Sequence, residues 1–494
     1  MIVAVAKNVI PWRFWAVLAA IAAALAALAT LGVVEVRQAR YAARLPALPD
    51  LSGQSPAVRE HLTEADRAAR ARPTSPEEVG ALGLAYHADM LYAQADASYA
   101  VAAELSGSPW RWTYYRALVQ DATGNADELA ARLREVVDLA PDFSPAWWRL
   151  GELEFKAGRY DGAEQAWRRV LALPEPTAPA AGEGKVRRVA AAPMSAHAAL
   201  GLARLALVRG DASAALERLE KLLASAPRFG PAVRLLAAAY DAAGRREDAD
   251  RALRLADRLP GYDPYIDPVL DTLVRESRSS TFLLQQASSA DLSLNAAWRE
   301  YLIRRALEFD PDNADALFEL ASVLRVLRRY DEALALLERH ERLAPGDFQV
   351  LADIGRCLSG LGRYPEAQSV LRRALAGLDD ANTRYDLGFV LERGGRVSEA
   401  IAEYRRALER NPNHRDALNN LGVDLARQGD LAQAVRQFER LVAVDPDNPD
   451  AHTNLGGVLL ARGAREAAGQ AFREALRLDS SHARARLGLR EATR

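Results

Sequence analysis

A repeat of 34 residues limits what this chain can fold into more than any other feature of its sequence. Between residues 382 and 482, the same residue classes return every 34 positions. They are a leucine-glycine pair, a second glycine, an alanine, an aromatic residue and a proline, found at Leu387-Gly388, Leu421-Gly422 and Leu455-Gly456, at Gly395, Gly429 and Gly463, at Ala400, Ala434 and Ala468, at Tyr404, Phe438 and Phe472, and at Pro412 and Pro446. Such a period predicts a stack of similar units, each packed on its neighbours.

The first glycine of each repeat predicts how two helices meet. Gly388, Gly422 and Gly456 lie in segments that are otherwise typical of helices, and a glycine inside a helix costs about 1 kcal/mol relative to alanine. The glycines therefore need a packing reason. We expect each one to lie where a second helix crosses closely, facing the alanine twelve residues further along the chain.

The pattern resembles the tetratricopeptide repeat, a helix-turn-helix unit of this period. The resemblance implies an all-α fold, a right-handed superhelical solenoid of about eleven helix-turn-helix repeats, which we expect to follow one transmembrane helix. Units in register also begin at Pro76, with Gly83, Ala117 and Gly151 again 34 residues apart. Because each unit packs only on its neighbours, 494 residues need no single large core.

The amino-terminal region contains a candidate membrane span. Residues 14–34 carry no charge over 21 positions, and a helix of this length reaches about 30 Å, enough to cross a bilayer. Cleavable signal peptides have apolar cores of roughly 7 to 15 residues, which favours a retained anchor, but the alanine-rich sequence leaves a cleaved signal as an alternative. We expect a single-pass inner (plasma) membrane protein with a periplasmic or exported repeat body. Positive charges flank the span on both sides, so a body on the cytoplasmic face stays open.

The register of the repeats divides the rest of the chain. We expect a tail at 1–13, a linker or stalk at 35–56, an amino-terminal array at 57–263 with a loop insertion at 174–195, an irregular connector at 264–294, a carboxy-terminal array at 295–482 and an end piece at 483–494. A lone helix at 58–71 is expected to cap the first repeat. The connector is either a tolerated insertion or a specialised contact site.

The resemblance implies an inner groove lined by the first helix of each pair. On that helix, the sites six and two residues before the small packing residue, and one and five after it, form one stripe, which we call the inner stripe. In the carboxy-terminal array its first two sites carry acids and amides, at Asp315, Glu319, Gln349, Asp353, Asn382, Asp386, Asp416, Asn420, Asp450 and Asn454. These side chains can hold the backbone of an extended peptide. The run is similar to the asparagine ladder in the repeat domain of the O-linked N-acetylglucosamine transferase, but only Asn420 and Asn454 match its amide position. The acids favour a basic ligand, and a solvated helix face is the alternative.

The amino-terminal array has a different inner face, which combines aromatic and basic side chains. They are Arg111, Tyr114, Tyr115, Trp148, Arg149, Phe155 and Lys156, on or beside the stripe of the second and third units. Aromatic rings next to cations can bind an acidic or aromatic segment. The alternative is that Trp148 and Phe155 cover the neighbouring helix as part of the core.

Composition and motifs give little support to catalysis or to nucleic-acid binding. Lysine and arginine total 64 against 66 acids, so no basic field favours nucleic acid. The single cysteine, Cys357, occupies an apolar site and is expected to be a buried structural thiol. The histidines are scattered without metal-ligand spacing, and nucleophile and dinucleotide motifs are absent. We expect no enzyme activity, no cofactor and no metal.

Two functions remain. The first is a membrane-anchored scaffold for protein-protein or peptide interactions, acting as an assembly or biogenesis factor of the bacterial cell envelope. The alternative is an accessory or targeting subunit that presents substrates to a separate enzyme, such as a glycosyltransferase or a secretion machine. The sequence does not define the oligomeric state.

Overall fold

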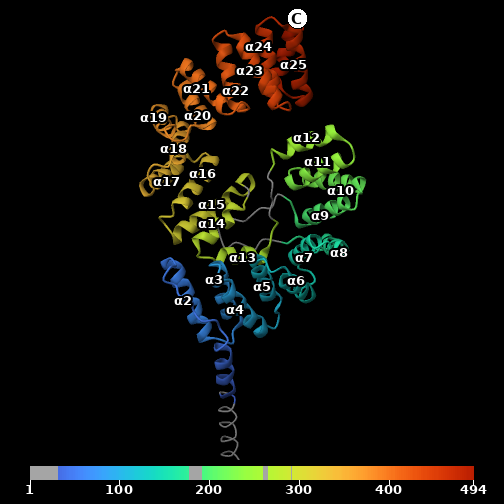
Figure 1. Cartoon of the computed structure of the whole chain (residues 1–494), viewed down its shortest axis with the longest axis vertical. Helices are drawn as coiled ribbons and strands as arrows, with labels where there is room; N and C mark the ends of the chain where they lie inside the picture. The colour runs from blue at the N-terminus through green and yellow to red at the C-terminus, as the bar shows by residue number, and fades with distance from the viewer. Residues whose placement is uncertain (1–29, 31, 177–191, 260–264, 291) are drawn as a thin grey trace, which may run out of the picture. The chain divides into compact units, whose positions relative to one another are not determined.

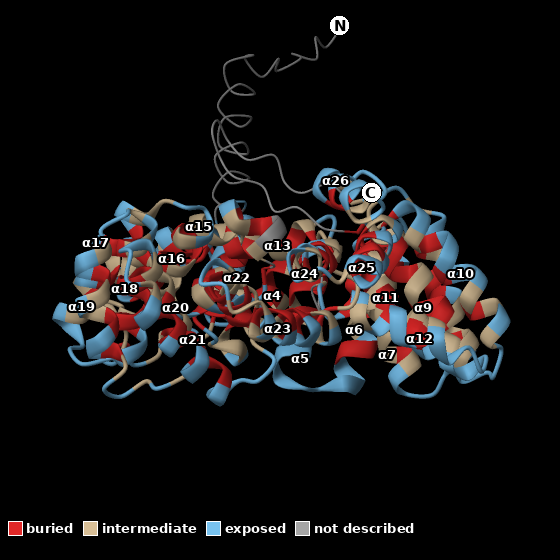
Figure 2. Cartoon of the chain, turned by 90° about the horizontal axis from the view of Figure 1, so that it is seen from above, coloured by how far each residue is buried: buried red, intermediate tan, exposed pale blue. Residues whose placement is uncertain are grey.

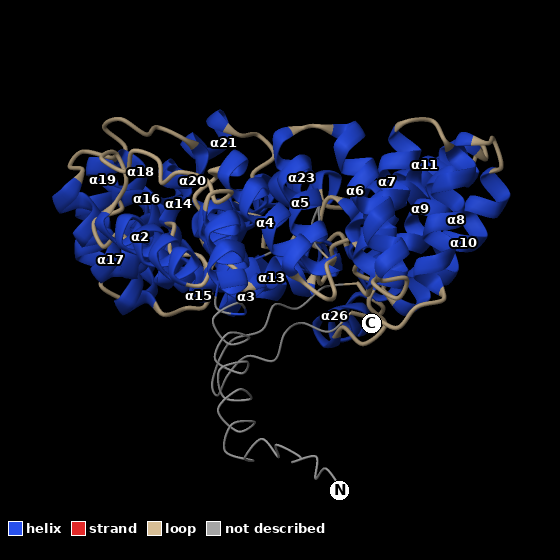
Figure 3. Cartoon of the chain, turned by 90° about the horizontal axis from the view of Figure 1, so that it is seen from below, coloured by secondary structure: helices blue, strands red, loops and turns tan. Residues whose placement is uncertain are grey.

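The computed structural model describes residues 30, 32–176, 192–259, 265–290 and 292–494, without the side chains of residues 293 and 294. Within these residues the chain consists of helices and loops and contains no strand (Figure 3). The chain divides into two compact units, Met1–Pro311 and Asp312–Arg494, which we call unit 1 and unit 2. The predicted all-α fold is therefore confirmed for the described residues.

The helices of each unit follow one another along the chain (Figure 1). Unit 1 contains α2 (Pro56–Ala71), α3 (Pro76–Ala88), α4 (Tyr92–Leu105), α5 (Trp110–Thr123), α6 (Ala126–Leu139), α7 (Ser144–Lys156), α8 (Tyr160–Leu171), α9 (Met194–Val208), α10 (Ala212–Ser225), α11 (Gly230–Ala242), α12 (Arg246–Ala256), α13 (Pro268–Glu276), α14 (Ser280–Ser288) and α15 (Leu292–Phe309). Unit 2 contains α16 (Ala314–Val326), α17 (Tyr330–Leu343), α18 (Phe348–Gly360), α19 (Tyr364–Ala374), α20 (Ala381–Arg393), α21 (Val397–Arg410), α22 (Arg415–Arg427), α23 (Leu431–Val444), α24 (Pro449–Ala461), α25 (Arg465–Leu478) and α26 (Ala483–Ala492).

Most of these helices form pairs joined by a short turn, as the repeat period predicts. Among the described residues there are eleven such pairs, from α3 with α4 to α24 with α25, while α2, α13 and α26 stand outside the pairing. With the exception of α12, each second helix also packs on the first helix of the next pair within its unit. Buried residues lie on the faces that neighbouring helices turn toward one another, and exposed residues lie mainly at the turns and outer faces (Figure 2).

Polar residues at the starts of the first helices fix where the repeats of unit 2 begin. Asn313 accepts a hydrogen bond from the backbone N–H of Ala316, and Asn448 accepts from the N–H groups of Asp450 and Ala451. A side-chain oxygen at this position satisfies N–H groups that have no partner inside the helix. These two caps define where α16 and α24 begin.

The crossing of the two helices in a pair differs from the sequence prediction in one detail. A Cβ atom added to Gly388 would lie 2.6 Å from the Tyr404 ring, and one on Gly422 would lie 2.8 Å from the Phe438 ring. The close crossing is confirmed, but the nearest atoms belong to the aromatic residue sixteen positions on, not to the alanine twelve positions on. The alanine side chain is a single methyl group, whereas the longer aromatic side chain reaches the space that a Cβ would need.

Residue volumes are matched across this crossing. Several pairs have alanine in place of the glycine, and these carry leucine in place of the ring, as in Ala117 with Leu133, Ala203 with Leu219 and Ala321 with Leu337, all of them buried. Close packing leaves little room for a change in total volume, so the two positions vary together. Most glycines at this position make space for a large ring. Gly355 is the exception, since a Cβ there would lie 2.5 Å from Leu371.

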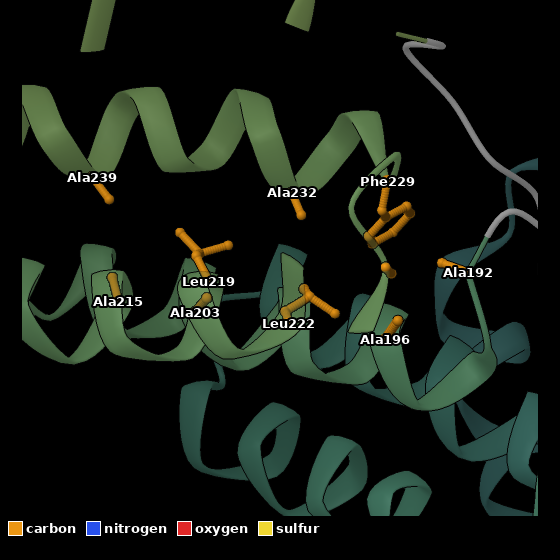
Figure 4. Packing of buried hydrophobic residues seen from close by; sticks show 10 residues of the cluster. Ala192, Ala196, Ala203, Ala215, Leu219, Leu222, Phe229, Ala232 and Ala239 are labelled. Carbon is orange, nitrogen blue, oxygen red and sulfur yellow. The ribbon is translucent and has the colours of Figure 1, made fainter. Parts of the chain in front are cut away.

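Alanine-rich faces let three consecutive helices of unit 1 approach closely. Figure 4 shows Leu219 of α10 pointing toward α11, the helix that carries Ala232 and Ala239. Ala196 and Ala203 of α9 belong to the same buried cluster, which is continuous from α9 to α11. This cluster follows the predicted loop insertion, of which residues 177–191 lie outside the described residues. The repeat packing is therefore regular on the carboxy-terminal side of the insertion.

The turn between the helices of a pair needs a left-handed backbone residue, and eight pairs use glycine there, for example Gly124 (φ 74°) and Gly395 (φ 77°). Arg328 occupies this position with φ 59°. A left-handed conformation costs a residue with a Cβ roughly 1 to 2 kcal/mol, part of which the greater flexibility of glycine in the unfolded chain offsets.

We therefore expect Arg328→Gly to raise the free energy of unfolding by about 0.5 to 1 kcal/mol. Urea unfolding followed by circular dichroism would measure the change. Ala335→Gly, at an exposed position inside α17, is the control and should destabilise the chain, because glycine weakens a helix interior. An unchanged or lowered midpoint for Arg328→Gly would contradict the assignment of strain to this turn.

The described residues contradict the predicted single-pass membrane location. Across those parts of the chain, no helix combines the length and the apolar character that a bilayer crossing requires. Most of the predicted span at 14–34 lies outside the described residues. Its described end belongs to a helix over 32–42 that includes Glu35, Arg37 and Arg40, which are costly to place in a membrane.

The predicted stalk at 35–56 is partly helical and contacts the repeats. The Tyr41 hydroxyl donates to Glu104 Oε1 (3.0 Å), and Arg44 Nη2 lies 2.6 Å from Glu104 Oε2 at the end of α4. Leu45 and Leu51 are buried. The lone helix predicted at 58–71 is present as α2 and packs on α3.

Two segments predicted to be irregular contain helices. The connector predicted at 264–294 holds α13, α14 and the start of α15, and the end piece predicted at 483–494 is helix α26. A Cβ on Gly488 would lie 2.3 Å from the Phe472 ring, so α26 packs on the preceding aromatic residue as a further first helix would.

Candidate functional site

The acids in the middle of the unit 2 inner stripe are held by arginines of the same chain. Asp353, which is buried, lies 2.8 Å from Arg356 Nη1 and 3.3 Å from Arg325 Nε. Arg356 Nε lies 2.6 Å from Asp386 Oδ2. Burial raises the pKa of Asp386, and Arg356 opposes that rise. Since these two acids already have cationic partners, they give no reason to expect a basic ligand.

The amides of the stripe form a connected chain of hydrogen bonds. Asn420 Nδ2 donates to the hydroxyls of Tyr385 and Tyr404, at 3.4 Å each. Asn419 Nδ2 donates to Asn420 Oδ1 (3.1 Å), and Asn454 Nδ2 donates to Asn419 Oδ1 (2.9 Å). This network links α20, α22 and α24, and it fixes the orientation of both amides that sequence comparison singled out. Asn419 was missed because it lies one residue off the predicted stripe.

Two of the stripe sites nearest the start of a first helix, Asn382 and Asp450, contact a histidine at the start of the next first helix. His414 Nε2 lies 3.1 Å from Asn382 Oδ1, and His482 Nε2 lies 3.2 Å from Asp450 Oδ1. Both histidines also cap their own helices, α22 and α26. Of the remaining predicted sites, Asp315 and Asp416 are exposed and Glu319 is half-buried.

A pocket of about 550 Å³ lies on the inner stripe at the end of unit 2, between α22, α24 and α26. Its lining includes Val423, Asn454, Gly457, Val458, Phe472 and Leu487. Gly457 is exposed, and no atom lies within 4 Å of the position its Cβ would take. Leu487 is 59% exposed. The wall of this pocket includes α26, which was not predicted as a helix. The sequence signal that could have revealed α26 is Gly488, which lies sixteen residues after Phe472.

Another segment of the same chain covers the predicted stripe residues of unit 1. Tyr114 and Tyr115 are fully buried. The Tyr114 hydroxyl donates to Asp267 Oδ2 (2.6 Å), and the Tyr115 hydroxyl donates to the carbonyl of Val269 (3.0 Å). We call residues 265–279 the connector segment. It lies against the inner stripe of unit 1, and α13 within it packs on α3 (Figure 1).

Trp148 and Arg149 contact the same segment. The ring centroids of Trp148 and Tyr265 are 4.4 Å apart, and the guanidinium of Arg149 lies 5.8 Å from the Tyr265 ring centroid. Arg149 Nε donates to the Tyr114 hydroxyl (2.9 Å), and Arg149 Nη2 lies 3.6 Å from Asp267 Oδ2. The connector segment therefore presents an aromatic and an acidic side chain to these residues.

The other predicted residues of this face lie at its edges. Arg111 stacks over Trp112, with its guanidinium 5.3 Å from the ring centroid. It lines a cavity of about 480 Å³ together with His61 and Thr272. Phe155 packs on Trp167 with ring centroids 5.6 Å apart, as the alternative of core packing predicts, and Lys156 is exposed.

Within the described residues, no group of three or more histidine, cysteine or acidic side chains is placed to hold a metal ion. Cys357 is buried, and burial raises the pKa of its thiol to about 12, so the thiol is unreactive at neutral pH.

Known families and structures match the repeats directly. Two family models described as tetratricopeptide repeats match this chain, one at residues 116–179 and 419–483, the other at 312–380 and 379–447. No curated protein matches the sequence.

Among solved structures, YrrB, "a TPR protein with an unusual peptide-binding site", is 26% identical over 38% of this chain and 97% of its own, with a TM-score of 0.33. The type IV pilus biogenesis factor PilW is 20% identical over 42% of this chain and 98% of its own, with a TM-score of 0.40. The Cut9–Hcn1 complex is 16% identical over 88% of this chain and 95% of the matched chain, also with a TM-score of 0.40. Residues 116–179 and 312–483 of this chain are thus built from tetratricopeptide repeats, as the 34-residue period predicts.

Proposed function

We propose that unit 2 binds an extended segment of a partner protein along its inner stripe, and that the pocket between α22, α24 and α26 receives one apolar side chain of that segment. The single observation that carries this proposal is the position of the pocket. It coincides with the stripe that the repeat geometry marks as the inner face, at Val423, Asn454 and Gly457. Repeat proteins present extended surfaces of this kind to other chains.

The contacts around the pocket define the chemistry of the ligand. Phe472, Val458 and the exposed Leu487 provide an apolar floor, so the ligand places an apolar side chain there. Asn454 offers amide hydrogen bonds to a peptide backbone. Both arginines of the lining have acidic partners, since Arg484 pairs with Asp450 and Arg427 lies near Glu392 and Asp424. The ligand is therefore a peptide recognised by its backbone and one apolar residue rather than by charge.

This function is binding rather than catalysis, and it fits two roles. The first is a scaffold that gathers partner proteins as an assembly factor, with the cell envelope as its proposed setting. The second is an accessory subunit that presents substrates to a separate enzyme. Affinity purification of the tagged full chain separates them, because a stoichiometric catalytic subunit supports the second role and structural or multiple clients support the first.

Gly457 allows the groove to be blocked without damage to the fold. A helical glycine costs about 1 kcal/mol relative to alanine, and the space above Gly457 is open, so larger residues should not destabilise α24. We expect Gly457→Tyr to keep the unfolding midpoint of the wild type or raise it. The variant should lose at least tenfold in affinity for peptides selected on the wild-type chain from a random peptide display library.

Two controls make this result specific. Gly457→Ala should bind the selected peptides as the wild type does, because a methyl group leaves the groove open. Gln470→Tyr places the same ring on an exposed position of α25 and should also bind normally. If the selected peptides bind Gly457→Tyr as tightly as they bind wild type, the proposed groove is not the binding site.

A further inference from the structure

The inner stripe of unit 1 contains a ligand that the chain supplies itself. From Tyr265 to Ser279, the connector segment contacts the repeats in the reverse of their order in the chain. Tyr265 lies near His197 of α9 and Trp148 of α7, and Asp267 contacts Tyr114 of α5. At the other end, Arg278 Nη1 lies 3.6 Å from Glu64 of α2. The segment thus follows the stripe from the middle of unit 1 back to its first helix.

Two side chains anchor the segment. Asp267 is 1% exposed and accepts a hydrogen bond from the Tyr114 hydroxyl. The same carboxylate caps α13 through the N–H groups of Val269 and Leu270. The Tyr265 ring is buried between Trp148, His197 and the Arg149 guanidinium. In the sequence Tyr-Ile-Asp-Pro, one residue separates Tyr265 from Asp267, and Pro268 follows Asp267 directly.

The segment does not fill the face that holds it. Beside Tyr265 there is a cavity of about 240 Å³, lined by Trp148, Arg149 and Lys156 among others. Beside α13 lies the cavity of about 480 Å³ that includes Arg111, Trp112 and Thr272. Arg111 in the larger cavity, and Trp148 and Arg149 in the smaller one, belong to the face that the sequence predicts to bind a ligand. Space of this kind next to specific anchors is typical of a recognition site rather than of a finished core.

We propose that the inner stripe of unit 1 is a binding site for peptides with the pattern aromatic residue, any residue, Asp, Pro, and that the connector segment occupies it as an internal ligand. A partner protein with such a segment binds unit 1 only by displacing the connector segment. This goes beyond the function proposed above, which concerns a different groove in unit 2, and either proposal can fail without the other.

An internal ligand has a high effective concentration, of millimolar order for short linkers. A free peptide of the same sequence must therefore bind the wild-type chain much more weakly than a chain whose own segment has lost its anchors. This difference separates an internal ligand from ordinary core packing, in which an added peptide has no site in either chain.

The experiment uses the full chain and a fluorescein-labelled peptide of residues 265–279, with binding followed by fluorescence anisotropy. The connector variant Tyr265→Ala with Asp267→Ala should bind this peptide at least tenfold more tightly than the wild type. A peptide carrying the same two substitutions should bind neither chain. Adding Tyr114→Phe to the connector variant should weaken binding about tenfold, since it removes the hydroxyl that donates to Asp267 and keeps the ring.

The proposal is overturned if the connector variant keeps wild-type helicity but binds the peptide no better than it binds a peptide of scrambled sequence. If the variant does not fold, hydrogen exchange of the wild-type chain decides instead. With the unlabelled peptide in millimolar excess, the amides of α13 should exchange at least threefold faster, because the chain's own segment is displaced. Unchanged exchange in α13 overturns the proposal.

Discussion

Replacing Trp167 with alanine is expected to lower the free energy of unfolding by about 3 to 5 kcal/mol, the range for truncating a large buried aromatic side chain. Trp167 is fully buried in α8. A Cβ on Gly151 of α7 would lie 2.5 Å from its ring, and a Cβ on Gly201 of α9 would lie 2.6 Å from it. The ring therefore packs on two successive first helices at once.

The loss should be large because neither glycine has a side chain that could move into the vacated space. The ring also contacts Phe155 and lies 5.4 Å from the Arg204 guanidinium. The substitution removes one of the contacts that join α7 and α9 on either side of the predicted insertion. Thermal and urea unfolding followed by circular dichroism would measure the effect.

Two variants test this reason for the loss. Trp147→Ala is the matched control, since Trp147 is only half-buried, and it should cost clearly less. Trp167→Leu combined with Gly151→Ala reproduces the leucine and alanine pairing of other repeats, such as Leu133 with Ala117. It should recover part of the stability that Trp167→Leu alone loses. A loss below about 1 kcal/mol for Trp167→Ala would contradict the packing described here.

The repeats could be predicted because their physical requirements recur with the period. A capping oxygen, a left-handed turn residue and a small residue at the crossing are each local, and each leaves a mark every 34 residues. The crossing at Gly388 was therefore identified without a structure. The partner of Gly388 was assigned wrongly because it depends on how far the Tyr404 ring extends, which residue spacing alone does not define.

The connector segment could not be placed from sequence because its contacts are not periodic. Asp267 bonds to Tyr114, which lies 153 positions earlier in the chain, and nothing in the local pattern connects the two. The sequence did show that Tyr114 and Arg149 favour an acidic or aromatic ligand. It also showed that the connector departs from the repeat signature, but it could not show that the connector is the segment that contacts them.

The ion pairs of unit 2 show the same limit. The stripe positions of Asp353 and Asp386 follow from the repeat register, but their ion pairs with Arg325 and Arg356 do not. Acids counted along a stripe suggest a basic ligand only while those acids lack partners within the chain. Identifying such partners requires the structure.

Asp424→Val is expected to stabilise unit 2 by about 1 to 3 kcal/mol at pH 7.5, the range for relieving an incompletely paired buried polar group. Asp424 is fully buried at the site that is occupied by Val323, Cys357, Val390 and Val458 in other repeats. Its Oδ1 lies 3.3 Å from Arg427, whereas its Oδ2 has no hydrogen-bond partner among the described residues. Valine fills the site without a polar atom, as it does in the neighbouring pairs.

The gain should depend on pH in a defined direction. Burial, together with the nearby Glu392, raises the pKa of Asp424 from 3.8 to about 6, and Arg427 opposes the rise. The folded chain therefore binds a proton more tightly than the unfolded chain does, so the contribution of Asp424 to stability falls as the pH rises from about 4 to above 6. The advantage of Asp424→Val should be greatest at pH 7.5 and smaller at pH 5, where the wild-type carboxyl is largely protonated. Unfolding midpoints of both chains at the two pH values would measure it. Asp416→Val, at an exposed site of the same helix, is the control and should not stabilise the chain. An Asp424→Val chain that is no more stable than wild type at pH 7.5 would mean that the carboxylate is better compensated than its contacts indicate.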